Sequence, residues 1–249
     1  MPEKTKPLRK RAATVLKSTA NAVLAPFDLT LARVRRGQAC TLDWVAESER
    51  QGMAVNDFIE KDQRKPALDE LQRLVYPRIA PDSTVCELGP GTGVYTRHLN
   101  EYLGGGQLHV VDSDPDAIDF LRRHLPKKPG TRLYRNSGTE LPLDTDGGID
   151  LVFCASMFTG GNLSYFHRYT QEFARVLRPG GHCVFDYFDI ATDAGWGVLT
   201  RNMARERPIF AYTYHTADTV DRVLRLHGLE PVERFGTIRG SVFVVARKP

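Results

Sequence analysis

The residues best suited to chemistry lie close together in a stretch of about ten positions. A glutamate precedes three glycines at alternate positions, in the order Glu87, Gly89, Gly91 and Gly93. Apolar residues come before the glutamate, and apolar residues at helical spacing come after the last glycine, which predicts a strand, a tight turn and a helix. Glycines let a backbone turn sharply and let a ligand lie directly against peptide groups. The stretch therefore predicts a ligand site with a carboxylate at the end of the strand.

A second carboxylate lies at the distance expected for a neighbouring strand. Residues 107–111 form a second predicted strand that ends in Asp112, 19 residues beyond Gly93. The carboxyl ends of adjacent parallel strands lie side by side, so Asp112 is expected beside the glycine turn, where it can accept two hydrogen bonds from a ribose diol. Asp114 and Pro115 then have the sequence of a helix N-cap and first turn.

The rest of the chain from residue 66 onwards supplies the elements that position these residues. Nearly continuous apolar runs, such as residues 149–154, are typical of strands covered by helices on both faces. Strands and helices alternate five times, which is typical of a doubly wound fold. Residues 232–238 and 241–246 are predicted to form a final hairpin around Arg239 and Gly240. We expect an α/β protein with a doubly wound, mostly parallel seven-stranded sheet, a C-terminal antiparallel hairpin strand and an N-terminal helical extension.

The glycine pattern distinguishes between families of nucleotide-binding proteins. Val94 stands where the dinucleotide fingerprint has its third glycine. The order Glu87-x-Gly89-x-Gly91-x-Gly93 instead strongly resembles motif I of class I S-adenosylmethionine-dependent methyltransferases. Asp112, residues 150–152, residues 175–181 and the terminal hairpin match further segments of that family, so the resemblance covers roughly residues 66–249.

The resemblance implies S-adenosylmethionine as cofactor and S-adenosylhomocysteine as its product. The implied cofactor-binding residues are Glu87, Gly89, Gly91, Gly93, Asp112, Ser113, Ser137, Gly138, Cys154, Ala155 and Ser156. Glu87 and the glycines would hold the methionine end, Asp112 the ribose, and the Gly138 amide the adenine ring. Ser137 stands where the family often has an aspartate, so that negative charge is missing here and the hydroxyl is a weaker acceptor.

Methyl transfer is a direct displacement, in which the protein aligns the nucleophile with the methyl group, and an oxygen nucleophile usually also needs a base. His215 is the first candidate because it follows two tyrosines and precedes a predicted helix, and His167 is the second. Asp186 and Asp189, beyond the fifth strand, are further candidates. For each of these residues, an ordinary packing or surface role remains the open alternative.

The acceptor is expected to be a small molecule or a glycan-like compound that is methylated on oxygen. An aromatic-rich segment, residues 187–215, is predicted to form the substrate wall. The Asp/Asn-Pro-Pro-aromatic motif of methyltransferases that act on nucleobase amino groups is replaced by residues 154–158, so no nucleic acid partner is expected. Two alternatives stay open: an N-methyltransferase of a small amine, which needs no strong base, and an S-adenosylmethionine-binding assembly protein without catalysis.

The positive charge is concentrated at the N-terminus. Residues 1–36 carry nine lysines or arginines against two acidic residues, whereas the remaining residues carry 25 against 28. Apolar and small residues between Leu8 and Phe27 fall on one helical face, which predicts a basic amphipathic helix. Such a helix binds an anionic membrane surface or a membrane-bound partner, or else packs on its own domain, and both interpretations stay open. The leader also resembles those of bacterial cell-surface glycan-modifying methyltransferases.

Residues 1–65 are therefore predicted to form an extension that could cover the cofactor or substrate, and residues 66–249 the main domain. The four cysteines have no metal-ligand spacing, so we expect reduced thiols and no metal site. No apolar run approaches the roughly 20 residues that span a bilayer, and no signal peptide is recognisable. These features predict a cytoplasmic protein, with peripheral membrane contact through residues 1–36 as an open alternative. The oligomeric state cannot be predicted.

Overall fold

The computed structural model describes residues 41–206, 209 and 211–249. The predicted amphipathic helix in residues 1–36 and Cys40 lie outside these residues. The described residues belong to one compact unit. In this part of the chain, no helix is long and apolar enough to cross a membrane.

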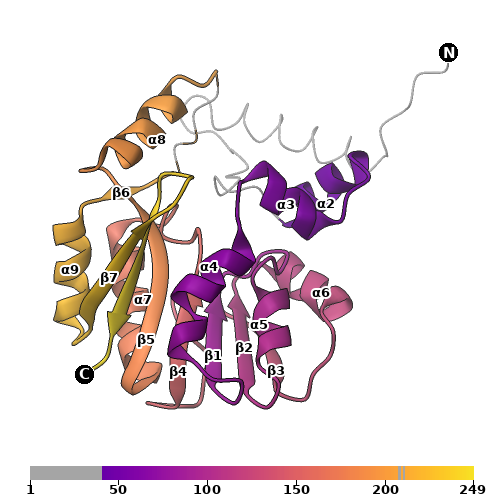
Figure 1. Cartoon of the computed structure of the whole chain (residues 1–249), viewed down its shortest axis with the longest axis vertical. Coiled ribbons are helices and arrows are strands. Elements are labelled where there is room, and N and C mark those ends of the chain that lie inside the picture. Colours follow the sequence, from indigo (N-terminus) through magenta and orange to yellow (C-terminus); the bar gives the residue numbers. More distant parts are fainter. Residues whose placement is uncertain (1–40, 207–208, 210) are drawn as a thin grey trace, which may run out of the picture. The chain divides into compact units, whose positions relative to one another are not determined.

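A single twisted sheet organises the unit (Figure 1). Its strands follow the order β3-β2-β1-β4-β5-β8-β7, and a short β6 pairs with the end of β5. All pairs are parallel except those of β8, which runs antiparallel between β5 and β7. The prediction of a doubly wound, mostly parallel sheet with an antiparallel hairpin strand is confirmed. The strands are β1 (Thr84–Leu88), β2 (Gln107–Asp112), β3 (Thr131–Arg135), β4 (Ile149–Cys154), β5 (Leu177–Asp189), β6 (Tyr214–His215), β7 (Glu230–Gly236) and β8 (Val242–Arg247).

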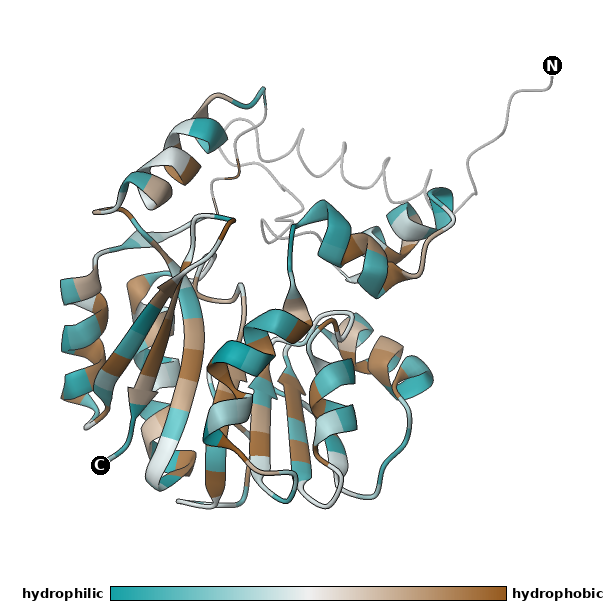
Figure 2. Ribbon diagram, in the orientation of Figure 1, coloured by the Kyte–Doolittle hydropathy of each residue, from teal (hydrophilic) through white to brown (hydrophobic). Residues whose placement is uncertain are grey.

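Helices cover both faces of the sheet and give two apolar cores. One core contains Leu71 of α4 (Ala67–Leu74), Leu99 of α5 (Thr96–Tyr102) and Leu121 of α6 (Pro115–His124). The other contains Phe173 of α7 (Leu163–Val176) and Val220 of α9 (Ala217–Leu226). A 3-10 turn, η2 (Tyr76–Arg78), leads from α4 towards β1. Hydrophobic residues concentrate on the central strands between the two helical layers (Figure 2).

Polar side chains cap the first turns of two helices, and the sequence predicted the cap at Asp114. The Asp114 side chain caps α6 by accepting a hydrogen bond from the Asp116 amide at 3.0 Å. Thr216 likewise caps α9, accepting from the Thr219 amide at 3.2 Å. These polar caps satisfy amide groups that the first helical turn leaves without an intrahelical partner.

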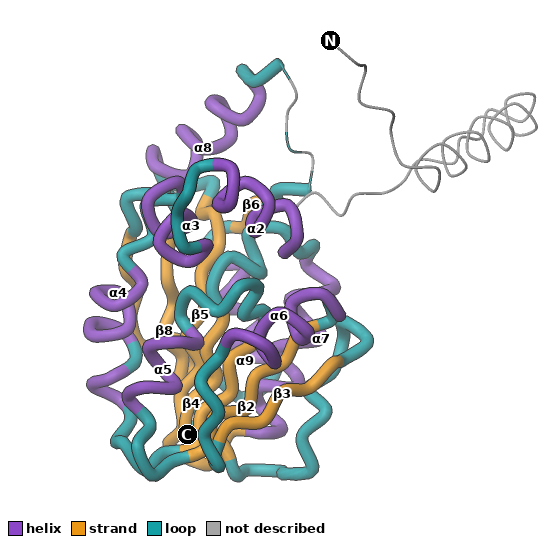
Figure 3. The backbone as a smooth tube through the Cα atoms, turned by 90° about the vertical axis from the view of Figure 1, so that its right-hand side faces the viewer, coloured by secondary structure: helices purple, strands orange, loops and turns teal. Residues whose placement is uncertain are grey.

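Three further helices lie beyond the carboxyl ends of the strands (Figures 1 and 3). They are α2 (Thr41–Arg50), α3 (Val55–Asp62) and α8 (Asp193–Met203). Phe58 and Ile59 of α3 join the core that also contains α4. Helix α8 lies in the segment that was predicted only as an aromatic wall.

The structure corrects one part of the predicted wall. Strand β5 continues to Asp189, four residues beyond the predicted end of the fifth strand. Tyr187 is fully buried in the core beside α7 and α9 as a result. Its aromatic ring packs inside the protein because alternate residues of a strand point to alternate faces, and position 187 points into the core.

Candidate functional site

The glycine turn connects β1 to α5 at the carboxyl end of the sheet. Gly89, Gly91 and Gly93 have φ angles of +73°, +56° and +84°, a region that L-amino acid side chains disfavour. A Cβ atom at Gly93 would lie 2.6 Å from Cδ2 of Leu121, whereas one at Gly91 would have no neighbour within 4 Å. The glycines are therefore required by backbone conformation at all three positions and by packing at Gly93, and Gly91 faces open space.

Glu87, near the end of β1, is only 2% exposed. Its Oε2 atom is buried and has no hydrogen-bond partner among the described residues. Burial raises the pKa of Glu87 to about 8, and the nearby negative charge of Asp112 adds to the effect. A buried carboxyl oxygen without a partner is costly, so it indicates a missing donor or cation.

The structure brings Asp112 to the glycine turn, as the strand spacing predicted. The Gly91 amide donates to Oδ2 of Asp112 at 3.4 Å, and the Asp114 amide donates to Oδ1 at 2.9 Å. Burial raises the pKa of Asp112 as well. Ser113 lies next to Gly138, where an added Cβ would be 3.7 Å from the Ser113 Cβ. The ends of β2 and β3 thus meet beside the glycine turn.

Beyond β3, Ser137 is hydrogen-bonded to the carboxylate of Glu140. The Ser137 amide donates to Oε1 of Glu140 at 2.7 Å, and the Ser137 hydroxyl donates to Oε2. These bonds lower the pKa of Glu140, which keeps the carboxylate ionised. The Gly138 amide donates to the Asn136 side chain at 3.2 Å. The Ser-x-x-Glu spacing resembles a helix capping box, but residues 136–148 contain no helix, so the spacing alone does not identify Glu140.

The third predicted segment follows β4 and has an unusual backbone. Cys154 is buried in the core, Ala155 is partly buried against the opposite core, and Ser156 has a φ of +62°. The Ser156 amide donates to Oδ1 of Asp186 at 2.5 Å. The next side chain, Met157, lies where a Cβ at Gly89 would meet it at 2.8 Å. The end of β4 therefore packs directly against the glycine turn, and Asp186 supports this arrangement.

His215 lies in a pocket of about 450 Å³ beside the loop that follows Ser156. The pocket is lined by Asn162, Leu163, Ile190, Thr213, Tyr214, His215, Thr216 and Thr219. The Thr213 amide donates to the Thr159 carbonyl at 3.0 Å, which joins the pocket to that loop. The Nε2 atom of His215 is buried without a hydrogen-bond partner among the described residues, and burial lowers the pKa of the imidazole. A neutral imidazole with an available nitrogen can accept a proton.

The other three predicted candidates, His167, Asp186 and Asp189, do not line this pocket. The His167 ring packs edge-on against His227, with ring centroids 4.6 Å apart, between α7 and α9. Asp189 is buried, and its carboxylate accepts from the Tyr187 hydroxyl at 3.1 Å and from the Ala191 amide at 3.0 Å. Its backbone pairs with His215 across β5 and β6. Asp189 therefore holds the end of β5 through local hydrogen bonds.

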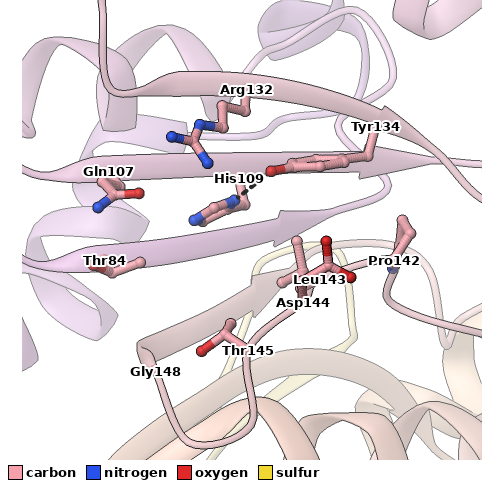
Figure 4. A pocket seen from close by; sticks show the side chains of 10 residues that line it. All are labelled: Thr84, Gln107, His109, Arg132, Tyr134, Pro142, Leu143, Asp144, Thr145 and Gly148. Atoms are coloured by element: carbon pink, nitrogen blue, oxygen red, sulfur yellow. Dashed lines mark hydrogen bonds between the residues drawn. The ribbon is translucent and has the colours of Figure 1, made fainter.

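A second pocket, of about 250 Å³, lies towards the amino ends of β1 and β2. Figure 4 shows His109, Arg132 and Tyr134 on the sheet facing the loop that carries Asp144 and Thr145. The connection from β3 to β4, residues 136–148, contains no helix, which leaves this part of the sheet face open. Because the glycine turn lies at the carboxyl ends of the strands, this pocket is separate from it.

Comparison with curated proteins supports one family. Residues 85–181 match a family model described as a methyltransferase domain. A malonyl-[acyl-carrier protein] O-methyltransferase of Methylococcus capsulatus is 29% identical over 152 residues, which cover 61% of this chain and 54% of that protein. An uncharacterised methyltransferase of Mycobacterium tuberculosis is 38% identical over 97 residues, covering 39% of this chain and 36% of that protein. The matched region thus spans about half or less of the length of these relatives.

Solved structures agree on the fold. A methyltransferase in complex with the Haloferax volcanii Trm112 activator has a TM-score of 0.64 at 18% identity, covering 88% of this chain and 99% of that one. A geranyl diphosphate C-methyltransferase of Streptomyces coelicolor, crystallised with S-adenosyl-L-homocysteine, has a TM-score of 0.56 at 15% identity, covering 74% and 76%. Residues 85–181 therefore form a methyltransferase domain like those of these relatives, within a chain that has the fold of class I S-adenosylmethionine-dependent methyltransferases.

Proposed function

We propose that this protein transfers a methyl group from S-adenosylmethionine to an oxygen atom of a small-molecule or glycan-like acceptor. The single observation that carries the choice of oxygen is the buried, unpartnered Nε2 of His215 in a pocket of about 450 Å³. A base of this kind is useful for a hydroxyl acceptor, which must lose its proton as it attacks.

The residues around the glycine turn fit the cofactor. The Oε2 atom of Glu87, which has no hydrogen-bond partner among the described residues, suits the ammonium group of the methionine moiety, and Asp112, next to Gly91, suits the ribose hydroxyls. The ionised Glu140 carboxylate suits the adenine amino group, in place of the aspartate that the family resemblance implies at position 137. When bound, the cofactor supplies an activated methyl group on its sulfonium.

The protein's own part in the reaction is orientation and proton transfer. Met157 packs against Gly89, and with Ser156 before it would form one side of the cofactor site. His215 would hold the acceptor hydroxyl through Nε2 and take its proton while the oxygen attacks. Because the pKa of His215 is lowered by burial, its imidazole is neutral and ready to accept a proton at neutral pH. Alignment of the acceptor oxygen with the methyl group and this proton transfer together would account for the faster methyl transfer.

The relatives differ in their acceptors, so the acceptor is inferred from this chain's own features. The Methylococcus relative is named for O-methylation, which agrees with the proposal. A ribosomal RNA small subunit methyltransferase A of Pseudomonas syringae is 31% identical over 98 residues. An RNA acceptor is disfavoured because residues 37–249 carry 25 basic and 28 acidic side chains, whereas RNA-binding domains are usually strongly basic.

The test combines cofactor binding with a labelled methyl-transfer assay on panels of hydroxyl and amine compounds. Calorimetry should detect S-adenosylhomocysteine binding, and a hydroxyl compound should accept label. His215→Gln should then lower kcat by about a hundredfold or more with a smaller change in KM. His124→Gln, a change in an exposed histidine at the end of α6, is the matched control.

Each alternative has its own outcome. Transfer to an amine that is unaffected by His215→Gln would establish the N-methyltransferase alternative. Cofactor binding without transfer to any compound in the panels would favour the assembly protein. Absence of cofactor binding at millimolar concentration would overturn the proposal as a whole.

A further inference from the structure

A group of nearly buried charged side chains joins three distant segments beside the cofactor site. Arg239 lies in the turn between β7 and β8, and its Nη2 is 3.2 Å from Oε1 of Glu70 on α4. The same Nη2 is 3.8 Å from Oδ2 of Asp186 on β5. The side chains of Arg239, Glu70 and Asp186 are 14%, 11% and 1% exposed. The guanidinium therefore lies between two carboxyl groups that water barely reaches.

The Asp186 carboxylate connects Arg239 to the end of β4. Its Oδ1 accepts the Ser156 amide hydrogen bond at 2.5 Å. Ser156 has a left-handed φ of +62°, which an L-residue adopts about five to thirty times less readily than the right-handed region. Without this hydrogen bond, Ser156 would tend to leave that conformation and take Met157 away from Gly89.

The Glu70 carboxyl connects Arg239 to the other side of the site. Its Oε2 accepts a hydrogen bond from the Tyr95 hydroxyl at 2.5 Å. Tyr95 follows Gly93 by two residues, and its ring packs edge-on against Phe153, with ring centroids 5.0 Å apart. Glu70 thus fixes the segment that leads from the glycine turn into α5.

The turn that carries Arg239 is itself held firmly. Oγ1 of Thr237 accepts hydrogen bonds from the amides of Arg239 and Ser241, both at 3.2 Å. Gly240 has a φ of +88°, and a Cβ there would lie 2.6 Å from Cγ2 of Val198 and 3.0 Å from the Ala194 carbonyl oxygen. Arg239 therefore extends from a fixed base, pressed against α8, towards both carboxyl groups.

We propose that Arg239 is a positioning residue that holds two sides of the cofactor site together, Ser156 through Asp186 and Tyr95 through Glu70. The inference deepens the proposed function and rests on it, because it assigns these contacts to cofactor geometry. Both contacts are made by Nη2, one end of a planar guanidinium, whereas a lysine ammonium is a compact point charge of different shape and reach. Arg239→Lys is therefore expected to keep only part of the effect.

The first experiment measures S-adenosylhomocysteine binding by calorimetry. Arg239→Gln should raise the dissociation constant by about tenfold or more, and Arg239→Lys by less. The matched control is Arg78→Gln, which also removes a nearly buried arginine, 12% exposed, from an ion pair with the hairpin. The Arg78 change should lower the melting temperature and leave the dissociation constant within about twofold.

The second experiment separates positioning from general stability. Glycine adopts positive φ without a steric cost, so Ser156→Gly in the Arg239→Gln background should recover about fivefold of the lost affinity, and Ser156→Ala should not. If Arg239→Gln folds poorly by circular dichroism, Asp186→Asn with and without Ser156→Gly tests the same connection.

Each outcome is decisive. Wild-type affinity in Arg239→Gln, or a loss of affinity that Ser156→Gly does not restore, would overturn the inference and leave the proposed function intact. A wild-type protein that fails to bind S-adenosylhomocysteine would overturn the proposed function and the inference together.

Discussion

We expect cofactor binding to depend on pH through the buried carboxyl of Glu87, which is proposed to pair with the ammonium group of the cofactor. Burial raises its pKa to about 8, so at pH 6 only about one molecule in a hundred of the free protein has this group ionised. The cofactor's ammonium pairs favourably only with the ionised form, so binding at this pH should release close to one proton. The dissociation constant should consequently fall about tenfold as the pH rises from 6 to 7.

The same shift affects the stability of the free protein. The folded-state pKa of about 8 lies above the ordinary value of 4.5, so the folded state binds the proton more tightly than the unfolded state. The stabilisation from this bound proton is complete below about pH 4.5 and is lost as the pH rises towards 8. At pH 7 about 3 kcal/mol of this stabilisation has been lost. Glu87→Gln removes the ionisable group, so it should raise the melting temperature at pH 7 and change it little at pH 5.

The assay is titration calorimetry with S-adenosylhomocysteine at pH 6.5 in two buffers of different ionisation enthalpy. The α-amino group of the ligand is protonated at this pH, so the proton count reports on the protein. Wild-type protein should release close to one proton, whereas Glu87→Gln should bind more weakly and release almost none. Glu140→Gln is the control, because the lowered pKa of Glu140 keeps that carboxylate ionised before binding. Equal proton release by wild type and Glu87→Gln, or an affinity that is constant from pH 6 to 7, would refute the reasoning.

Two further predictions concern the packing that supports the site. Gly93→Ala should lower the free energy of unfolding by about 2 kcal/mol or more, because the new Cβ meets Leu121 and the φ of +84° disfavours alanine; equal melting temperatures would contradict this account. Phe158 is 1% exposed and packs edge-on against several aromatic rings. Phe158→Ala should therefore lower the free energy of unfolding, measured with denaturant, by about 3–5 kcal/mol. The control is Leu226→Ala, at a residue that is 68% exposed, which should lower it by about 0.5 kcal/mol or less.

Much of the fold could be predicted because its signals are local. Apolar runs identified the central strands, and capping residues such as Asp114 identified helix starts. Strand β6 has only two residues and hence no periodicity to recognise. Helix α8 was missed because two glycines and the 56% exposed Trp196 weaken its helical pattern. The length of β5 was missed because aromatic residues at its end suit both a core and a ligand pocket.

In the candidate site, too, some residues could be predicted from local sequence patterns, whereas contacts between distant segments could not. The glycine turn and Asp112 could be predicted together because adjacent parallel strands end side by side. Arg239 and Glu70 are in contact although they lie far apart in the sequence, near opposite ends of residues 66–249. No short motif predicts such a contact. Glu140 could not be identified for a different reason: no sequence signal shows that a side chain three residues later reaches back to position 137.

The distribution of unsatisfied polar atoms helps to decide which end of the sheet is functional. A buried polar atom without a hydrogen-bond partner costs about 1–3 kcal/mol, so folded proteins keep few of them. Among the described residues, such atoms include those of Glu87, Asp186 and His215 at the carboxyl ends of the strands. In the pocket at the other end, Nδ1 of His109 is 3.1 Å from the Tyr134 hydroxyl, and no described lining residue carries an unsatisfied buried side-chain atom. The two pockets therefore differ in chemistry: the pocket at His215 retains a buried nitrogen without a hydrogen-bond partner, whereas the described residues that line the second pocket contribute no such buried atom.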